Sequence, residues 1–184
     1  FEPLGADADT TEGVNPHGAI VDELHAHRTR AMWDVLETAT GSRRQPLVLA
    51  ITTSGVNRAG VCYEQHLYLK RILEGVLEDD ATFGVIYTID EGDDWRTPAA
   101  WAKANPNLGV SVKPEALGAL CKKAQEQPSA QAAFLTKRLD VWVNAGSPWI
   151  PAEAWARCAR SLTLDEVRDW DCWVGLDLAT KDDV

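Results

Sequence analysis

The short apolar run Gly18–Val21 ends directly in two adjacent carboxylates, Asp22 and Glu23. A continuous apolar run of this kind is typical of a strand that is buried on both faces of a parallel sheet. In open parallel sheets, ligands bind at the edge formed by the carboxyl ends of the strands. The sequence therefore predicts a buried parallel strand that delivers two acids to a ligand-binding edge.

Two further apolar runs, Pro46–Thr52 and Thr82–Ile89, follow along the chain. The intervening residues 26–40 and 58–74 carry apolar side chains at spacings of three and four, which indicates helices. Strand–helix–strand–helix–strand is the pattern of a parallel sheet with crossover helices. We therefore predict an α/β fold in which the three apolar runs are neighbouring or near-neighbouring parallel strands.

The second half of the chain is mostly helical in its pattern. Helices are predicted over Pro98–Ala104, 113–125, Pro128–Leu139 and Pro151–Ala159. The final segment, Cys172–Leu178, is predicted to be a new strand that presents Asp177. Around 144–151 the helical pattern is weakest, and the composition there predicts a linker into a second domain.

The acids and the hydroxyls that end the first two strands fit a nucleotide site. Asp22 and Glu23 match a Walker B motif, in which the first acid helps to hold Mg²⁺ and a neighbouring group positions the attacking water. Thr52, Thr53 and Ser54 end the next strand, where hydroxyls can sense the γ-phosphate and transmit its loss. The structural alternative is a surface pair of acids beside an ordinary helix cap. No G-x-x-x-x-G-K-[ST] loop occurs in the 184 residues, so the chain is expected to be a piece of a longer ATPase.

Composition limits the other functions. The net charge of −10 disfavours non-specific DNA attraction by this piece alone. The four cysteines form no C-x-x-C pair, and no apolar run approaches the length of a membrane span. His25-Ala26-His27 allows a zinc alternative, but zinc needs three or four ligands and the others are not evident.

Asp177, with Asp182 and Asp183, is a second candidate site. An aspartate near the end of a strand is how a two-metal nuclease begins its site, because carboxylates clamp two ions around the scissile phosphate. Spacing alone does not distinguish a nuclease metal site from a solvated acidic tail.

These segments, taken in order, resemble the large terminase subunit of tailed bacteriophages, an ATP-driven DNA-packaging motor joined to an RNase H-like nuclease. The resemblance covers nearly the whole chain and depends on the order and spacing of several strings. They are N-P-H-G-A-I-V-D-E-L-H-A-H, W-D-V-L-E-T-A-T-G-S-R-R-Q-P-L, I-T-T-S-G, C-Y-E-Q, Y-T-I-D-E-G-D-D-W, W-A-K-A-N-P-N-L-G-V-S-V-K, F-L-T-K-R-L-D-V-W-V-N-A and W-V-G-L-D-L-A.

The resemblance implies a role for each motif of the ATPase part. Asp22 corresponds to the Walker B aspartate that holds the Mg²⁺ of ATP, and Glu23 corresponds to the catalytic glutamate. Thr52, Thr53 and Ser54 correspond to the coupling motif. The implied fold is part of a P-loop-type parallel sheet with crossover helices, followed by a helical linker region and the first strand of an RNase H-like nuclease.

The resemblance also implies domain boundaries and a nuclease site. Residues 1–143 would be the C-terminal part of the ATPase domain with its helical closing region, 144–170 a linker, and 171–184 the start of the nuclease. Asp177 corresponds to the first metal-binding aspartate of the nuclease, and Asp183 falls where members often carry a further acid. Both would bind Mg²⁺ or Mn²⁺.

The implied partners are ATP, double-stranded viral DNA, the small terminase subunit and the portal. A homo-oligomer is expected during packaging, with no membrane, in the host cytoplasm and transiently docked on the procapsid. The piece alone is expected to hydrolyse neither ATP nor DNA. The alternatives are another P-loop ATPase, such as a helicase, and a non-catalytic module that binds the motor or the portal.

Overall fold

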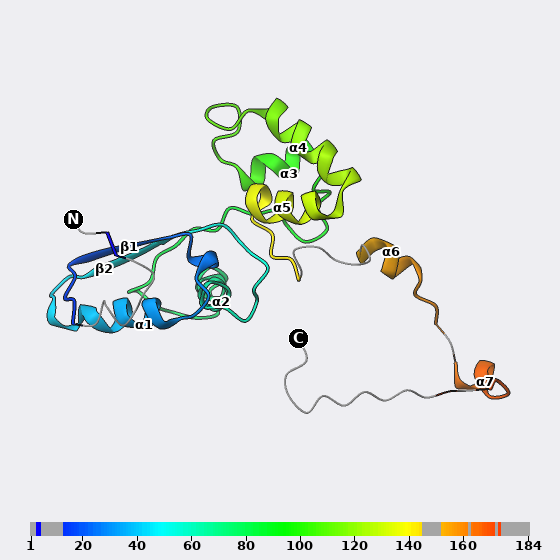
Figure 1. The fold of residues 1–184 in the computed structure, drawn as a ribbon, viewed down its shortest axis with the longest axis horizontal. Helices are drawn as coiled ribbons and strands as arrows, with labels where there is room; N and C mark the ends of the chain where they lie inside the picture. Colours follow the sequence, from blue (N-terminus) through cyan, green and yellow to red (C-terminus); the bar gives the residue numbers. More distant parts are fainter. Residues whose placement is uncertain (1–2, 5–12, 145–151, 162, 172, 174–184) are drawn as a thin grey trace. The chain divides into compact units, whose positions relative to one another are not determined.

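The computed structural model describes residues 3–4, 13–144, 152–161, 163–171 and 173. The chain divides into two compact units, Phe1–Trp149 and Ile150–Val184. Figure 1 shows the elements of both units along the chain. The first unit carries the sheet and the candidate site.

The sheet of the first unit has two parallel strands, β1 (Gly18–Asp22) and β2 (Leu47–Ile51). Gly18 lies opposite Leu47, and the register runs without interruption to the pair Asp22 and Ile51. The connection between the strands is helical, as residues 26–40 predict. A parallel pair requires a crossover connection, and here that connection is a helical segment. The prediction of two parallel strands joined by a helix is therefore confirmed.

Three short helices make that crossover. They are η1 (Leu24–Ala26), α1 (Ala31–Thr38) and η2 (Ala39–Ser42). Met32 and Leu36 of α1, one turn apart, are buried in the first core. After β2, the helix α2 (Val61–Leu73) contributes two more buried side chains to the same core. The core consists of Val21, Leu24, Met32, Leu36, Val61 and Cys62.

Only one face of the sheet packs on this core. Side chains alternate between the two faces of a strand, and residues paired in register share a face. Ala19, Val21 and Val48 lie in or against the core, whereas the opposite face is exposed. The exposed apolar residues of that face are Ile20, Leu47, Leu49 and Ile51. The expectation of strands buried on both faces is therefore wrong within the part of the chain that the structure describes.

The third predicted strand, Thr82–Ile89, is also wrong. These residues form no β-ladder, and no backbone hydrogen bond joins 83–89 to another described residue. Phe83, Val85 and Tyr87 are exposed, and they alternate with half-buried neighbours. A strand needs a partner for its backbone groups, and side-chain pattern alone does not supply one. The segment has the composition of a strand without the neighbour that would complete it.

Three helices build a second core in the first unit. They are α3 (Pro98–Ala104), α4 (Pro114–Glu126) and α5 (Pro128–Leu139), and each begins with a proline. Proline suits this position because its fixed φ is helical and its missing N–H has no partner to lose. Thr97 also caps α3, accepting a hydrogen bond from Ala100 N. The buried side chains of this core are Trp101, Leu117, Cys121, Ala124, Phe134 and Leu139.

The described residues of the second unit include two short helices, α6 (Ala152–Arg157) and α7 (Leu164–Val167). Thr163 and Glu166 form a capping box at the start of α7. The predicted strand Cys172–Leu178 lies outside the described residues, except for Trp173. Among the helices that the structure describes, none is long and apolar enough to cross a membrane.

Candidate functional site at the ends of the parallel strands

The two acids lie where β1 ends. Asp22 is the last residue of the strand, is exposed, and pairs with no other described side chain. Glu23 N donates to Ile51 O at 2.8 Å, and its backbone then turns into the left-handed region with φ 52° and ψ 49°. This conformation is strained for a residue with a side chain, so the surrounding contacts must hold it. The free carboxylate of Asp22 has the oxygen donors that Mg²⁺ prefers.

His25 connects this turn to the end of β2. Its backbone N–H donates to Thr52 Oγ1 at 3.0 Å, and its Nδ1 lies 3.0 Å from the same oxygen. Nδ1 also lies 2.9 Å from Glu23 Oε2, and Nε2 contacts Lys137 Nζ. Burial lowers the pKa of His25, the Lys137 ammonium lowers it further, and Glu23 acts in the opposite direction. The ring is therefore neutral near pH 7.

The three hydroxyls of the predicted coupling motif have different surroundings. Thr52 Oγ1 donates to Thr53 O at 2.9 Å and accepts from His25, so its hydrogen bonds are made within the protein. Thr53 Oγ1 accepts from Lys137 Nζ at 3.3 Å. Ser54 is 2% exposed, and its hydroxyl donates to Thr136 O at 3.2 Å. The motif thus joins the end of β2 to α5.

Side chains from outside the helix satisfy the last carbonyls of α5. The final four carbonyls of a helix have no partner within it. Ser54 supplies a donor to Thr136 O, Thr88 Oγ1 donates to Leu139 O at 3.1 Å, and Asn105 Nδ2 donates to Arg138 O at 2.8 Å. The C-terminus of α5 is therefore capped by Ser54 after β2, by Thr88, and by Asn105 at the end of α3.

Asp140 completes this junction. It caps α5 in the left-handed conformation, with φ 54° and ψ 37°, and its carboxylate accepts a hydrogen bond from Ser54 N. Burial raises the pKa of Asp140 above its ordinary value, although the hydrogen bonds from Ser54 act against this. A half-buried carboxylate thus holds the backbone of Ser54, in the predicted coupling motif.

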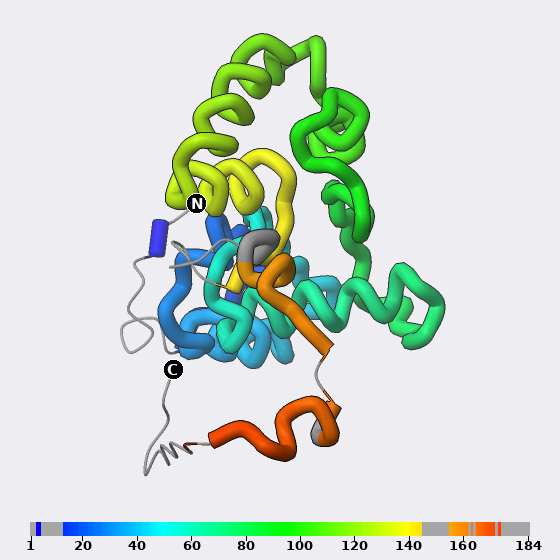
Figure 2. The backbone as a smooth tube through the Cα atoms, turned by 90° about the vertical axis from the view of Figure 1, so that its right-hand side faces the viewer, coloured from blue at the N-terminus to red at the C-terminus, as the bar shows by residue number. Residues whose placement is uncertain are grey.

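The residues after Asp140 return to the first core. Trp142 packs edge-on against Tyr63 of α2, with ring centroids 4.8 Å apart. Arg58 Nη2 donates to Trp142 O at 2.8 Å, and Val143 N donates to Gly55 O at 3.4 Å. Figure 2 shows this segment leaving α5 toward the first core. The chain that leaves the helical region is anchored beside the strand ends.

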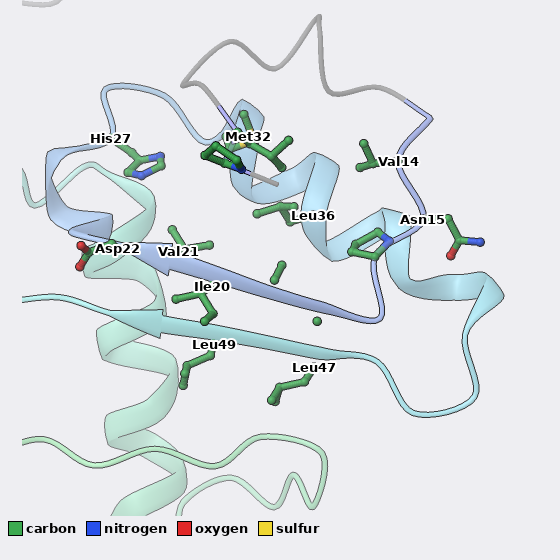
Figure 3. Close-up of a pocket in the computed structure, with 15 residues that line it drawn as sticks. Val14, Asn15, Ile20, Val21, Asp22, His27, Met32, Leu36, Leu47 and Leu49 are labelled. Carbon is green, nitrogen blue, oxygen red and sulfur yellow. The ribbon is translucent and has the colours of Figure 1, made fainter. Parts of the chain in front are cut away.

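A large cavity lies along β1 and is distinct from this junction (Figure 3). It has a volume of about 880 Å³ and is lined mostly by apolar residues of β1, β2 and α1. Asp22 and His27 lie at one end of it, and Asn15 lies at the other. Phosphate groups need converging N–H or cationic donors, which this lining does not offer. The edge formed by the strand ends, and not the cavity, is the candidate site.

The structure brings Asp22, Glu23, Thr52 and Thr53 to one edge of the sheet, as the sequence predicts. Asp177 and Asp183 lie outside the described residues. A zinc site at His25 and His27 is not supported, because both ring nitrogens of His25 contact protein groups. No group of three potential metal ligands occurs among the residues that the structure describes.

Sequence reasoning missed His25 as a contact of Glu23, and it missed Lys137, Asp140 and Trp142 altogether. These contacts join residues far apart in the chain: 112 positions separate His25 from Lys137, and 86 separate Ser54 from Asp140. The string F-L-T-K-R-L-D-V-W contains all three missed residues, but its local pattern indicates only a helix end.

Comparison with known families defines the class. The family model for the ATPase domain of the terminase large subunit matches residues 1–71, and the model for its endonuclease domain matches residues 76–184. End to end, the two matches describe a protein that joins an ATPase domain to an endonuclease domain. The chain belongs to the terminase large subunit family. This assignment favours a terminase over the helicase alternative, whereas the boundaries at 143 and 170 remain predictions.

Individual relatives agree with the family. Protein YmfN of Escherichia coli K12 is 42% identical over 174 residues, which are 94% of this chain and 38% of YmfN. The large terminase subunit of Enterobacteria phage HK97 is 26% identical over 186 residues, covering 100% of this chain and 35% of that protein. The crystal structure of the HK97 large terminase matches with a TM-score of 0.62 and 25% identity, over 80% of this chain and 30% of that one. The chain thus spans little more than a third of its relatives' length.

Proposed function

We propose that this chain is part of a large terminase subunit that hydrolyses ATP at the strand-end edge to drive viral DNA into a procapsid. One observation carries the ATPase proposal: the parallel register of β1 and β2 brings Asp22 and Glu23 beside Thr52 and Thr53. In P-loop enzymes this edge faces the γ-phosphate. The P-loop itself and the RNase H-like nuclease fold are part of this proposal.

Each strand-end residue has a distinct part in the proposed reaction. Mg²⁺ bound with ATP would neutralise charge that develops on the phosphates. Asp22, whose carboxylate is exposed and unpaired among the described residues, would hold the ion. Glu23 would orient the attacking water and accept its proton. Thr53 would lie nearest the departing phosphate, and Ser54 would pass the change to α5 through Thr136.

The test is ATP hydrolysis by the intact subunit that contains this sequence. Glu23→Gln keeps the shape of the side chain but removes the basic oxygen, so turnover should fall by about 10²-fold or more while ATP binding persists. Asp22→Asn should also weaken Mg²⁺-dependent binding of ATP. Glu37→Gln, on the exposed part of α1, is the matched control. A normal rate of phosphate release by Glu23→Gln would reject the proposed role.

The second activity is metal-dependent DNA cleavage. We place its first carboxylates at Asp177 and Asp183, which would bind Mg²⁺ or Mn²⁺ through oxygen ligands. Double-stranded viral DNA, the small terminase subunit and the portal are the proposed partners, and a homo-oligomer in the host cytoplasm is the proposed packaging form. Support comes from the match of the endonuclease family model to residues 76–184.

A further inference from the structure

The proposed mechanism gives no part to His25, although this residue contacts Glu23. The imidazole side chain is 13% exposed and the Glu23 side chain is 55% exposed. The backbone N–H of His25 is tied to Thr52 Oγ1 as well, so both ends of the residue are fixed to the neighbouring strand. The ring is thus the immobile member of the pair, and the carboxylate is the member that can move.

The contacts of the ring decide which nitrogen carries the proton. Lys137 Nζ, an ammonium with three donors and no acceptor, contacts Nε2. Nε2 must therefore offer its lone pair, which leaves the ring proton on Nδ1. Nδ1 is hydrogen-bonded to Thr52 Oγ1 at 3.0 Å, and it also lies 2.9 Å from Glu23 Oε2, a carboxylate oxygen that can only accept. The lysine on α5 thereby selects the tautomer that places a protonated Nδ1 between Thr52 and Glu23.

We propose that His25 is a positioning residue for the Glu23 carboxylate, and that Lys137 enables this by fixing the ring tautomer. The inference rests on the proposed role of Glu23 in orienting the attacking water. A ring N–H that is fixed to Thr52 and lies 2.9 Å from the carboxylate attracts Glu23 Oε2 and favours a position beside Thr52. In many sites a carboxylate or carbonyl orients a catalytic imidazole. Here the imidazole would instead orient the catalytic carboxylate.

This arrangement links the helical region to the chemistry. Lys137 lies on α5, whose C-terminus is also held by Ser54 and Asp140. A shift of α5 that withdrew Lys137 would leave Nε2 free to carry the ring proton instead. Nδ1 would then present its lone pair to the Glu23 carboxylate, and the attraction that holds Glu23 beside the ring would be lost. The position of α5 would thus set whether Glu23 is aligned.

The test uses steady-state ATP hydrolysis by the intact subunit with four variants. His25→Ala should lower kcat by about 10-fold and leave KM for ATP nearly unchanged, as expected when alignment and not binding is lost. His25→Asn should restore most of the rate, because its amide N–H can replace Nδ1–H. Lys137→Met should also lower kcat, as His25→Ala does. His27→Ala, at one end of the cavity, is the matched control and should leave kcat unchanged.

A second measurement covers variants that fail to fold in the intact subunit. Long-range ¹H–¹⁵N spectra of the 184-residue chain should show a protonated Nδ1 and an unprotonated Nε2 at His25, and Lys137→Met should give a mixture of tautomers. A protonated Nε2 in the unsubstituted chain would overturn the inference.

The outcomes separate this inference from the proposed function. If Glu23→Gln hydrolyses ATP normally, the proposed function itself fails. If Glu23→Gln is inactive but His25→Ala has an unchanged or a higher kcat, the proposed function stands and the positioning role is wrong. Equal loss of rate in His25→Ala and His25→Asn would also contradict it, because the N–H beside Glu23 would then be irrelevant.

Discussion

Asp140 offers the sharpest test of the junction between α5 and the strand ends. Asp140→Ala removes the acceptor of Ser54 N–H and places a residue with a Cβ but no polar group in the left-handed region. An unpaired N–H at this half-buried site costs about 1–3 kcal/mol. The left-handed conformation adds about 1–2 kcal/mol for alanine, part of which aspartate also bears. We expect Asp140→Ala to lose about 2–4 kcal/mol of unfolding free energy.

Two companion variants separate the contributions. Asp140→Asn keeps an acceptor and tolerates the left-handed region, so its unfolding free energy should lie within about 0.5 kcal/mol of the unsubstituted chain. Asp140→Gly relieves the backbone strain but still leaves Ser54 N–H without its acceptor, so it should lose about 1–3 kcal/mol. The assay is urea unfolding of the 184-residue chain at pH 7, followed by tryptophan fluorescence.

The pH dependence gives an independent check. Because burial raises the pKa of Asp140, the folded chain binds this proton more tightly than the unfolded chain does. Asp140 therefore contributes stability below its ordinary pKa of 3.8, and this contribution is lost as the pH rises through the folded pKa. As the pH rises from 4 to 7, the stability of Asp140→Asn should therefore increase relative to that of the unsubstituted chain. Asp140 does not hold Ser54 as described if Asn is as destabilising as Ala, or if Ala costs less than about 0.5 kcal/mol.

Three further outcomes are expected, two from contacts in the structure and one from the proposed nuclease site. Trp142→Ala should lower the unfolding free energy by about 2–4 kcal/mol in the same urea assay, because it removes the ring that packs against Tyr63. Trp142→Phe keeps an aromatic ring and should lose less than half of that free energy. Ser54→Ala should cost about 1 kcal/mol, since it leaves the Thr136 carbonyl without its donor, and an unchanged midpoint would contradict that cap. Asp177→Ala in the intact subunit should abolish plasmid cutting with Mn²⁺ and spare phosphate release with Mg²⁺; a parallel loss of both activities in folded protein would reject a separate nuclease site.

Local patterns were enough to predict much of the fold. The bounds of α3 and α5 agree with the sequence prediction, because a proline fixes the first turn of each helix. The parallel pair β1 and β2 was predictable because both are apolar runs joined by a helical segment. The alignment of Asp22 with the end of β2 follows from that pairing. These features depend on interactions within a few residues or on one well-known connection rule.

The remaining features depend on partners that a single sequence does not reveal. Residues 82–89 have the composition of a strand, but a ladder requires a second backbone beside them. Ser54 belongs to the predicted coupling motif, yet its burial follows from the docking of α5. The contact of His25 with Lys137 arises only when α5 returns to the strand ends. The role of Asp177 rests on the family resemblance and lies beyond the described residues.

The uncovered face of the small sheet affects how the chain self-associates in solution. Ile20, Leu47, Leu49 and Ile51 form an apolar strip on the face of the sheet away from the core, and one edge of β2 has no strand partner among the described residues. Such edges template strand addition between molecules, and apolar strips favour self-association. The net charge of −10 opposes close approach at low ionic strength, but salt screens that repulsion. Colloidal stability of the isolated chain should therefore decline as salt is added.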